Sequence, residues 1–154
     1  DWSSDVCSSD LLDGGGRGVI FVTKAATGAE NALSIEAYGE GGGIFWEQKN
    51  ANELRVMRHN RPAELRTRGL PTLHPLTKRA TRISAGHPEA FLEAFANIYA
   101  DFAWLVAARR TGQKPDPLAA MVPDALTGAD GLAFIDACLE SNAKGGWVNV
   151  PRVG

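Results

Sequence analysis

The pattern of apolar and polar residues divides the chain into a strand-rich first half and a helical second half. Segments that are rich in β-branched and aromatic residues, or that alternate with a period of two, predict strands. These segments cover residues 17–25, 32–38, 44–48, 53–58 and 63–68. The glycine-rich stretch 39–43 (GEGGG) predicts a hairpin turn, because glycine adopts positive φ at little cost. The charged polar face of 63–68 predicts an edge strand.

Apolar residues at three- and four-residue steps predict two helices, over 88–110 and 129–144. Pro88 suits the first turn of the first helix, and Gly112 suits its end. The segment 69–86 reads as a connector because of its glycines and prolines, and 147–150 (WVNV) reads as a short closing strand. The first helix carries an apolar stripe that we expect to face a core: Phe91, Ala94, Phe95, Ile98, Tyr99, Phe102, Leu105 and Val106.

Strands followed by helices predict an α+β fold with a largely antiparallel, open-faced sheet and helices packed on one face. Ile44, Phe45 and Trp46 follow one another on one predicted strand, so both of its faces carry apolar side chains. An uncovered apolar face predicts an association surface, which we expect to form a homo-oligomer.

The first eleven residues, DWSSDVCSSDL, have no hydrophobic period and no signal-peptide pattern. Back-translation gives a DNA string that looks like a widely used sequencing-library adapter over all eleven residues. We therefore interpret 1–11 as adapter-encoded and expect this segment to make no packing contacts or hydrogen bonds with the rest. On this interpretation 12–154 is a C-terminal domain that is incomplete at its N-terminus.

Charge and cysteine content exclude several classes of protein. The chain has 16 Lys and Arg against 18 Asp and Glu, and three of the acidic residues lie in 1–11. A nearly neutral remainder argues against nucleic acid and membrane partners, and the apolar runs are shorter than the roughly 20 residues of a membrane helix. Cys138 is the single cysteine outside 1–11, so there is no disulfide framework. We expect a cytoplasmic protein.

The usual signatures of catalysis are missing from the sequence. Neither glycine cluster, 14–18 or 39–43, fits G-x-G-x-x-G, and both lie between predicted strands. His59, His74 and His87 have no partner at metal-ligand spacing, and Cys138 lies in the middle of a helix. We therefore predict no catalytic, cofactor-binding or metal-binding residue in this chain.

Residues 53–82 hold a basic cluster with two possible interpretations. It is either a face for an anionic ligand or the solvated edge of a hairpin, and the absence of aromatic residues between Trp46 and Phe91 argues against stacking of nucleic-acid bases. The cluster consists of Arg55, Arg58, Arg61, Arg66, Arg68, Lys78, Arg79 and Arg82.

His87 is the one candidate for substrate binding. Pro88 disfavours a helical conformation at His87, so the imidazole is expected just outside the helix, on a connector near free N–H donors. Imidazole both donates and accepts hydrogen bonds near neutral pH. The alternative is a histidine that caps or packs against the helix.

Three stretches together resemble one family. TGAENALSIEAYGEGGGIFWEQKNANELRV (27–56), AGHPEAFLEAFANIYADFA (85–103) and DGLAFIDACLESNAKGGWVNV (130–150) are similar to the C-terminal domain of the glucose–fructose oxidoreductase, inositol dehydrogenase and MocA (Gfo/Idh/MocA) family. The resemblance extends over essentially all of 12–150, in order.

The resemblance implies a parent enzyme that oxidises a sugar, cyclitol or related polyol with NAD or NADP. It implies an N-terminal Rossmann domain for the cofactor, and a C-terminal domain that lines the substrate pocket and forms a homo-oligomer through its sheet. The E-K-P lysine and the Asp–His pair of the family have no counterpart here, so this chain alone is expected to be inactive and to bind no cofactor. Only His87 carries over, as part of the block G-H-P-E beside the pocket. The alternative is a stand-alone, non-catalytic ligand-binding or dimerisation module.

Overall fold

A computed structural model describes residues 6–12 and 14–153. The chain divides into two units, one formed by Asn31–Val122 and the other by the residues up to Glu30 together with Pro123–Gly154. The predicted domain of 12–154 therefore contributes to both units, and its boundaries stay a prediction.

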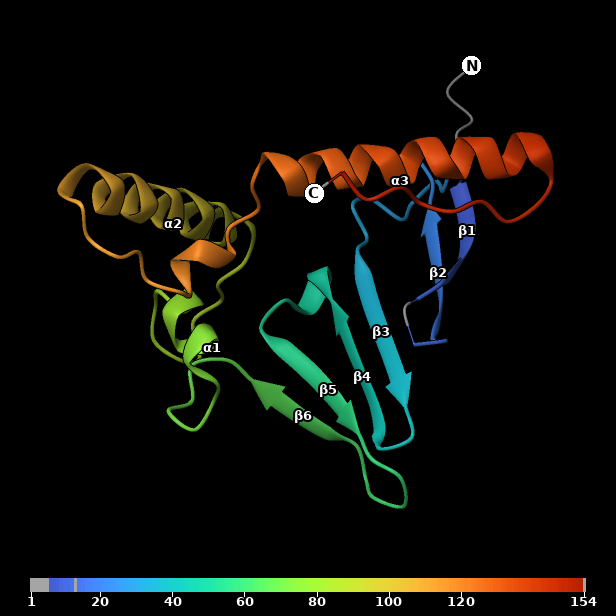
Figure 1. Ribbon diagram of the computed structural model, residues 1–154. Coiled ribbons are helices and arrows are strands. Elements are labelled where there is room, and N and C mark those ends of the chain that lie inside the picture. The colour runs from blue at the N-terminus through green and yellow to red at the C-terminus, as the bar shows by residue number, and fades with distance from the viewer. Residues whose placement is uncertain (1–5, 13, 154) are drawn as a thin grey trace. The chain divides into compact units, whose positions relative to one another are not determined.

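The Asn31–Val122 unit is built on a four-stranded antiparallel meander with strand order β3-β4-β5-β6 (Figure 1). The strands are β3 (Ser34–Gly39), β4 (Gly42–Glu47), β5 (Glu53–Met57) and β6 (Glu64–Thr67), each within two residues of its predicted bounds. The predicted turn between β3 and β4 is confirmed: Gly42 has φ 142°, and a Cβ there would lie 2.1 Å from the Met57 carbonyl oxygen. The fold is α+β with an open-faced, largely antiparallel sheet, as predicted.

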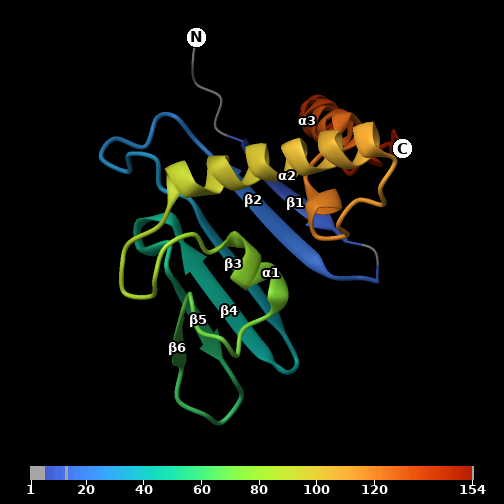
Figure 2. The same cartoon turned by 90° about the vertical axis from the view of Figure 1, so that its left-hand side faces the viewer.

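Three helical segments follow or interrupt this sheet. A single turn, η1 (Gln48–Asn50), joins β4 to β5, and the short helix α1 (Pro75–Ala80) lies inside the predicted connector. The long helix α2 (Phe91–Thr111) is continuous (Figure 2) and ends at Gly112, whose φ of 68° is the left-handed conformation expected of a helix-ending glycine. A further turn, η2 (Ala119–Met121), lies against α2.

The other unit contains β1 (Val6–Leu11), β2 (Arg17–Val22) and α3 (Ala125–Lys144). Helix α3 begins four residues before its predicted start, because Asp124 Oδ1 accepts a hydrogen bond from the Thr127 N–H at 2.9 Å and caps it. The predicted strand 147–150 does not form. This segment runs back along α3 (Figure 1), and the Val153 N–H donates to Asp130 Oδ1 at 2.8 Å.

Two further predictions about strands are wrong. Strand β2 pairs with β1 in a separate two-stranded sheet, so the strands of 17–68 do not form one sheet. Residues 6–11 also make hydrogen bonds that we did not expect, since all six pair with β2 in antiparallel register. Backbone pairing depends little on sequence, so even an adapter-encoded segment can add to a free strand edge. Residues 1–5 and the side chains of 6–11 lie outside the described part of the chain.

The apolar stripe of α2 does not face a core. Its polar stripe instead faces α1 within this unit, while Phe91 is 63% and Tyr99 71% exposed. By length and composition alone α2 is apolar enough to cross a membrane, which the run-length argument missed. Among the described residues the buried apolar side chains are Ala119 and Ala137. This chain thus covers little of its own apolar surface.

Candidate functional site

The predicted site residue, His87, lies in a tight turn just before α2. The His87 N–H donates to the Ser84 carbonyl at 3.2 Å, and Gly86 has φ 88°. The side chain is exposed, and its ring makes no hydrogen bond or ion pair with any described residue. His87 therefore presents a free imidazole at this corner.

Helix α2 begins three residues later than predicted, so Pro88 lies outside it. Ala90 occupies the cap position with φ −152° and ψ −120°, and its N–H donates to Glu93 Oε2 at 2.9 Å. This hydrogen bond lowers the pKa of the Glu93 carboxyl below its ordinary value. The capping alternative for His87 is not realised. The histidine that caps a helix is His74, whose Nδ1 accepts from the Leu76 N–H at 3.2 Å at the start of α1.

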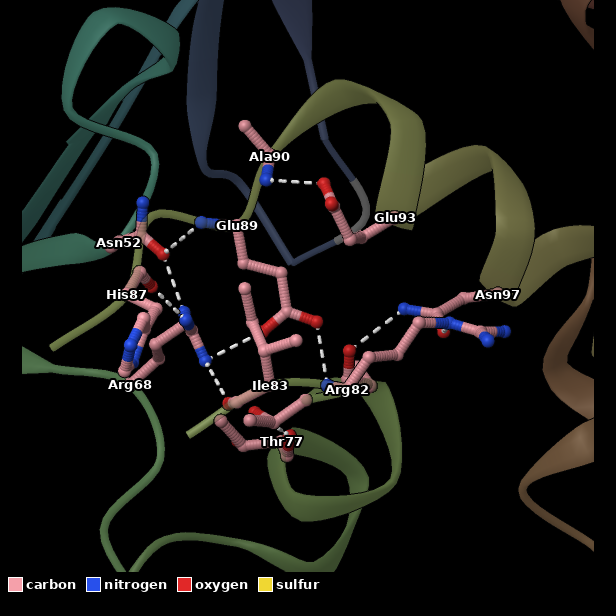
Figure 3. Close-up of polar contacts among 12 residues, drawn as sticks. Asn52, Arg68, Thr77, Arg82, Ile83, His87, Glu89, Ala90, Glu93 and Asn97 are labelled. Carbon is pink, nitrogen blue, oxygen red and sulfur yellow. Dashed lines mark hydrogen bonds and ion pairs between the residues drawn. The ribbon is translucent and has the colours of Figure 1, made fainter. Parts of the chain in front are cut away.

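A buried ion pair lies directly behind the His87 corner (Figure 3). Glu89 Oε2 is 2.5 Å from Arg68 Nη1, and the two side chains are 5% and 14% exposed. Glu89 Oε1 also accepts the Arg82 N–H at 2.5 Å, whereas Oε2 meets Arg68 as an ion pair without hydrogen-bond geometry. Glu89 is the buried charged residue of the described chain.

Asn52 joins the same cluster from the turn between β4 and β5. Its Oδ1 accepts hydrogen bonds from Arg68 Nε and from the Glu89 N–H, the latter at 3.1 Å. Arg68 also donates to the Ile83 carbonyl at 2.9 Å and to the His87 carbonyl. Asn52 and the segment 83–89, which are distant in sequence, therefore meet at the Arg68 guanidinium (Figure 3).

Sequence reasoning missed this cluster because the hydrogen bonds of Arg68 and Asn52 join residues that are 15 to 37 positions apart. Arg68 was one of eight cations in the basic cluster, and Glu89 fell within the predicted helix of 88–110. One signal was available, because Glu89 directly follows the His87–Pro88 pair at the edge of that helix.

Half of the basic cluster forms ion pairs with carboxylates of the described chain: Arg58, Arg66, Arg68 and Arg79. Arg55 lies over the Phe45 ring with its Cζ 5.7 Å from the ring centroid. Arg66, with Arg58, pairs with Glu64, whose pKa is lowered chiefly by the hydrogen bond from Arg66. Further contacts join α1 and the segment after it to α2 and the loop that follows α2: Arg79 to Asp101 and Asp116, and Arg82 to Asn97 and the Ala96 carbonyl.

Two cavities lie in the Asn31–Val122 unit. One, of about 400 Å³, is formed by the turn of the β3–β4 hairpin and the end of β5. The other, of about 310 Å³, lies between α1 and α2, where Trp104 stands beside the paired Arg79 and Asp101. His87 lines neither of these two cavities.

Neither glycine cluster forms the turn of a dinucleotide-binding motif. Both glycine clusters connect antiparallel strands, β1 to β2 and β3 to β4, whereas a dinucleotide phosphate needs a strand-to-helix turn. Within residues 6–12 and 14–153, no three His, Cys, Asp or Glu side chains gather as a metal site would require.

The sequence and fold of this chain are similar to parts of several oxidoreductases. The chain is 28% identical over 137 residues to an uncharacterized oxidoreductase, YfiI, of Bacillus subtilis (strain 168), covering 88% of this chain and 35% of that protein. No family model matches. A crystal structure of an oxidoreductase from Sinorhizobium meliloti superposes with a TM-score of 0.80 and 36% identity, over 88% of this chain and 37% of that one.

An inositol dehydrogenase homolog from Azotobacter vinelandii, complexed with NADH and myo-inositol, gives a TM-score of 0.80 and 28% identity. The match covers 91% of this chain and 37% of that one. Our chain is thus related to oxidoreductases over nearly its whole length and spans little more than a third of theirs.

Proposed function

We propose that this chain is the C-terminal part of an NAD- or NADP-dependent oxidoreductase of the Gfo/Idh/MocA family that acts on a sugar, cyclitol or related polyol. The observation that carries the proposal is the match of nearly the whole chain to about a third of several oxidoreductases. The complex of one of them with NADH and myo-inositol supports a polyol substrate and a nicotinamide cofactor. The cofactor would be held by the rest of the parent, since the described residues offer no place for its phosphates.

The accessible surface supports the proposal that this chain belongs to a larger body. Helix α2 exposes large apolar side chains, among them Phe91, Tyr99 and Trp104. The remaining two thirds of the parent, and further copies of it, would cover such surface.

The chain's own contribution would be substrate binding and assembly. The exposed His87 imidazole would exchange a hydrogen bond with a substrate hydroxyl, at a corner fixed by buried neighbours. The open sheet face would carry the homo-oligomer contact. The parent is proposed to be cytoplasmic, with no nucleic acid or membrane partner.

The isolated chain should not bind NAD or NADP. Because neither glycine cluster forms a strand-to-helix turn, no N–H donors converge on a pyrophosphate. Calorimetric titration of the 154-residue chain with each cofactor should therefore give no binding heat at micromolar concentrations. A micromolar dissociation constant would show that the chain holds a cofactor site of its own.

His87→Ala in the parent should lower kcat/KM for the polyol roughly three- to tenfold, since a lost substrate hydrogen bond costs about 0.5–1.5 kcal/mol. The cofactor KM and the melting temperature should stay nearly unchanged, because the ring is exposed and unpaired. His59→Ala is the matched control, an exposed histidine on the turn between β5 and β6. Equal kinetics of the two variants would remove His87 from the site.

The alternative function, a stand-alone binding or dimerisation module, makes a different prediction about the source DNA. An open frame that continues upstream of the Leu12 codon and encodes a Rossmann domain supports the dehydrogenase. A start codon close to the Leu12 codon would instead favour the module.

A further inference from the structure

We propose that Arg68 is a positioning residue for His87: its guanidinium fixes the backbone of the 87–89 turn and so sets where the His87 imidazole meets the substrate. This inference rests on the proposed function, because His87 is a substrate contact only in that proposal. Arg68 would touch neither substrate nor cofactor and would act entirely through His87.

The Arg68 side chain holds several groups around the His87 turn at once. All three of its nitrogens are engaged: Nε with Asn52 Oδ1, Nη1 with the Ile83 carbonyl and Glu89 Oε2, and Nη2 with the His87 carbonyl (Figure 3). Arginine holds its donors in a rigid planar fork, so these acceptors are fixed relative to one another. With 14% of its side chain exposed, the guanidinium has little freedom to move away.

The backbone is also held on either side of Pro88. The His87 carbonyl is held by Arg68, and the Glu89 N–H by Asn52, whose Oδ1 is itself bonded to Arg68. Between them, Pro88 has a fixed φ and no N–H of its own. Hydrogen bonds thus hold the backbone immediately before and after Pro88. The side-chain torsions are then the main conformational freedom of His87.

The segment that precedes His87 contains a glycine with open space around it. Gly86 has φ 88°, and a Cβ built there would meet nothing within 4 Å. Glycine in open space gives the chain a soft hinge on the N-terminal side of His87. On this side the His87 N–H bonds the Ser84 carbonyl at 3.2 Å and Arg68 bonds the Ile83 carbonyl, so the Arg68 cluster contributes to the anchoring here too.

The test compares Arg68→Lys with Arg66→Lys, a matched change on the same strand at an exposed arginine that pairs with Glu64. Lysine keeps the charge but cannot bond Asn52, Ile83 and His87 together. In the full-length parent, Arg68→Lys should lower kcat/KM for the polyol three- to tenfold with the cofactor KM unchanged, and Arg66→Lys should change neither.

A double variant separates positioning from a merely structural role. If Arg68 acts through His87, Arg68→Lys should have less than a twofold effect on kcat/KM in the His87→Ala background. Multiplicative loss in the double variant would overturn the proposal, as would a folded Arg68→Lys enzyme with wild-type kinetics. If Arg68→Lys does not fold, Asn52→Ala gives the same comparison, because it removes a single acceptor of the cluster.

Amide hydrogen exchange in the 154-residue chain gives a readout that does not depend on activity. Arg68→Lys should raise the exchange rates of the His87 and Glu89 amides at least tenfold, whereas Arg66→Lys should leave them unchanged. Unchanged exchange in Arg68→Lys would overturn the proposal. A different combination is faster exchange in Arg68→Lys together with normal kinetics of His87→Ala in the parent. That result would refute the proposed contact of His87 with substrate but would leave the positioning of the 87–89 turn by Arg68 intact.

Discussion

Glu89→Ala should lower the free energy of unfolding of the chain by about 3 kcal/mol, because it leaves the guanidinium of Arg68 largely buried and without its anionic partner. The substitution also removes the acceptor of the Arg82 N–H. No other described carboxylate is as enclosed, so this position should be the most sensitive acidic residue. Denaturant unfolding followed by circular dichroism measures the difference.

Glu53→Ala is the matched control, the same change at an exposed position of β5 in the same unit. It should alter the free energy of unfolding by less than about 0.5 kcal/mol, as surface substitutions usually do. Equal losses for Glu89→Ala and Glu53→Ala would mean that the Arg68–Glu89 pair does not stabilise the fold.

Ile35→Glu should convert the parent from an oligomer to a monomer. The register of β3, β4 and β5 places Ile35 opposite Trp46 and Ala37 opposite Ile44, so these side chains share one apolar face. Ile35 is 60% exposed, whereas the predicted contact Trp46 is half-buried with its Nε1 donating to the Ala51 carbonyl. A carboxylate at Ile35 would lose its hydration in an interface without gaining a partner.

Size-exclusion chromatography with light scattering gives the assembly state of each variant. Trp46→Glu should have the same effect as Ile35→Glu, although it also disturbs the sheet. Leu65→Glu is the control, since Leu65 is 59% exposed and lies on the opposite face, across from Arg55. An Ile35→Glu protein of unchanged mass, or a monomer produced only by Leu65→Glu, would contradict a contact through the Ile35 face.

Short-range patterns predicted most of the sheet, because strand alternation and turn glycines are local properties. The β3–β4 hairpin follows from the GEGGG turn, and Gly42 occupies the conformation that only glycine adopts easily there. The starts of α1 and α3 were missed although their signals were local too: His74 before Pro75, and Asp124 three residues before Thr127.

Long-range contacts account for the larger misses. Asn52 accepts the Glu89 N–H across 37 residues of sequence, just before α2 begins, and no periodicity records such a contact. The apolar stripe of α2 was predicted to face a core but is exposed, because periodicity marks an apolar face without stating what packs on it. His87 was proposed through its proline neighbour and stays a prediction, whereas Arg68 could not be told apart from seven other cations.

The central claim is that this chain is the substrate side of a nicotinamide-dependent polyol oxidoreductase. The most direct measurement is the rate of NADH or NADPH formation by the full-length parent, supplied with either cofactor and with myo-inositol, related cyclitols and simple sugars. NADH or NADPH should form only when both a nicotinamide cofactor and one of these polyols are present. A parent that binds NAD or NADP but forms no reduced cofactor with any sugar, cyclitol or polyol would contradict it.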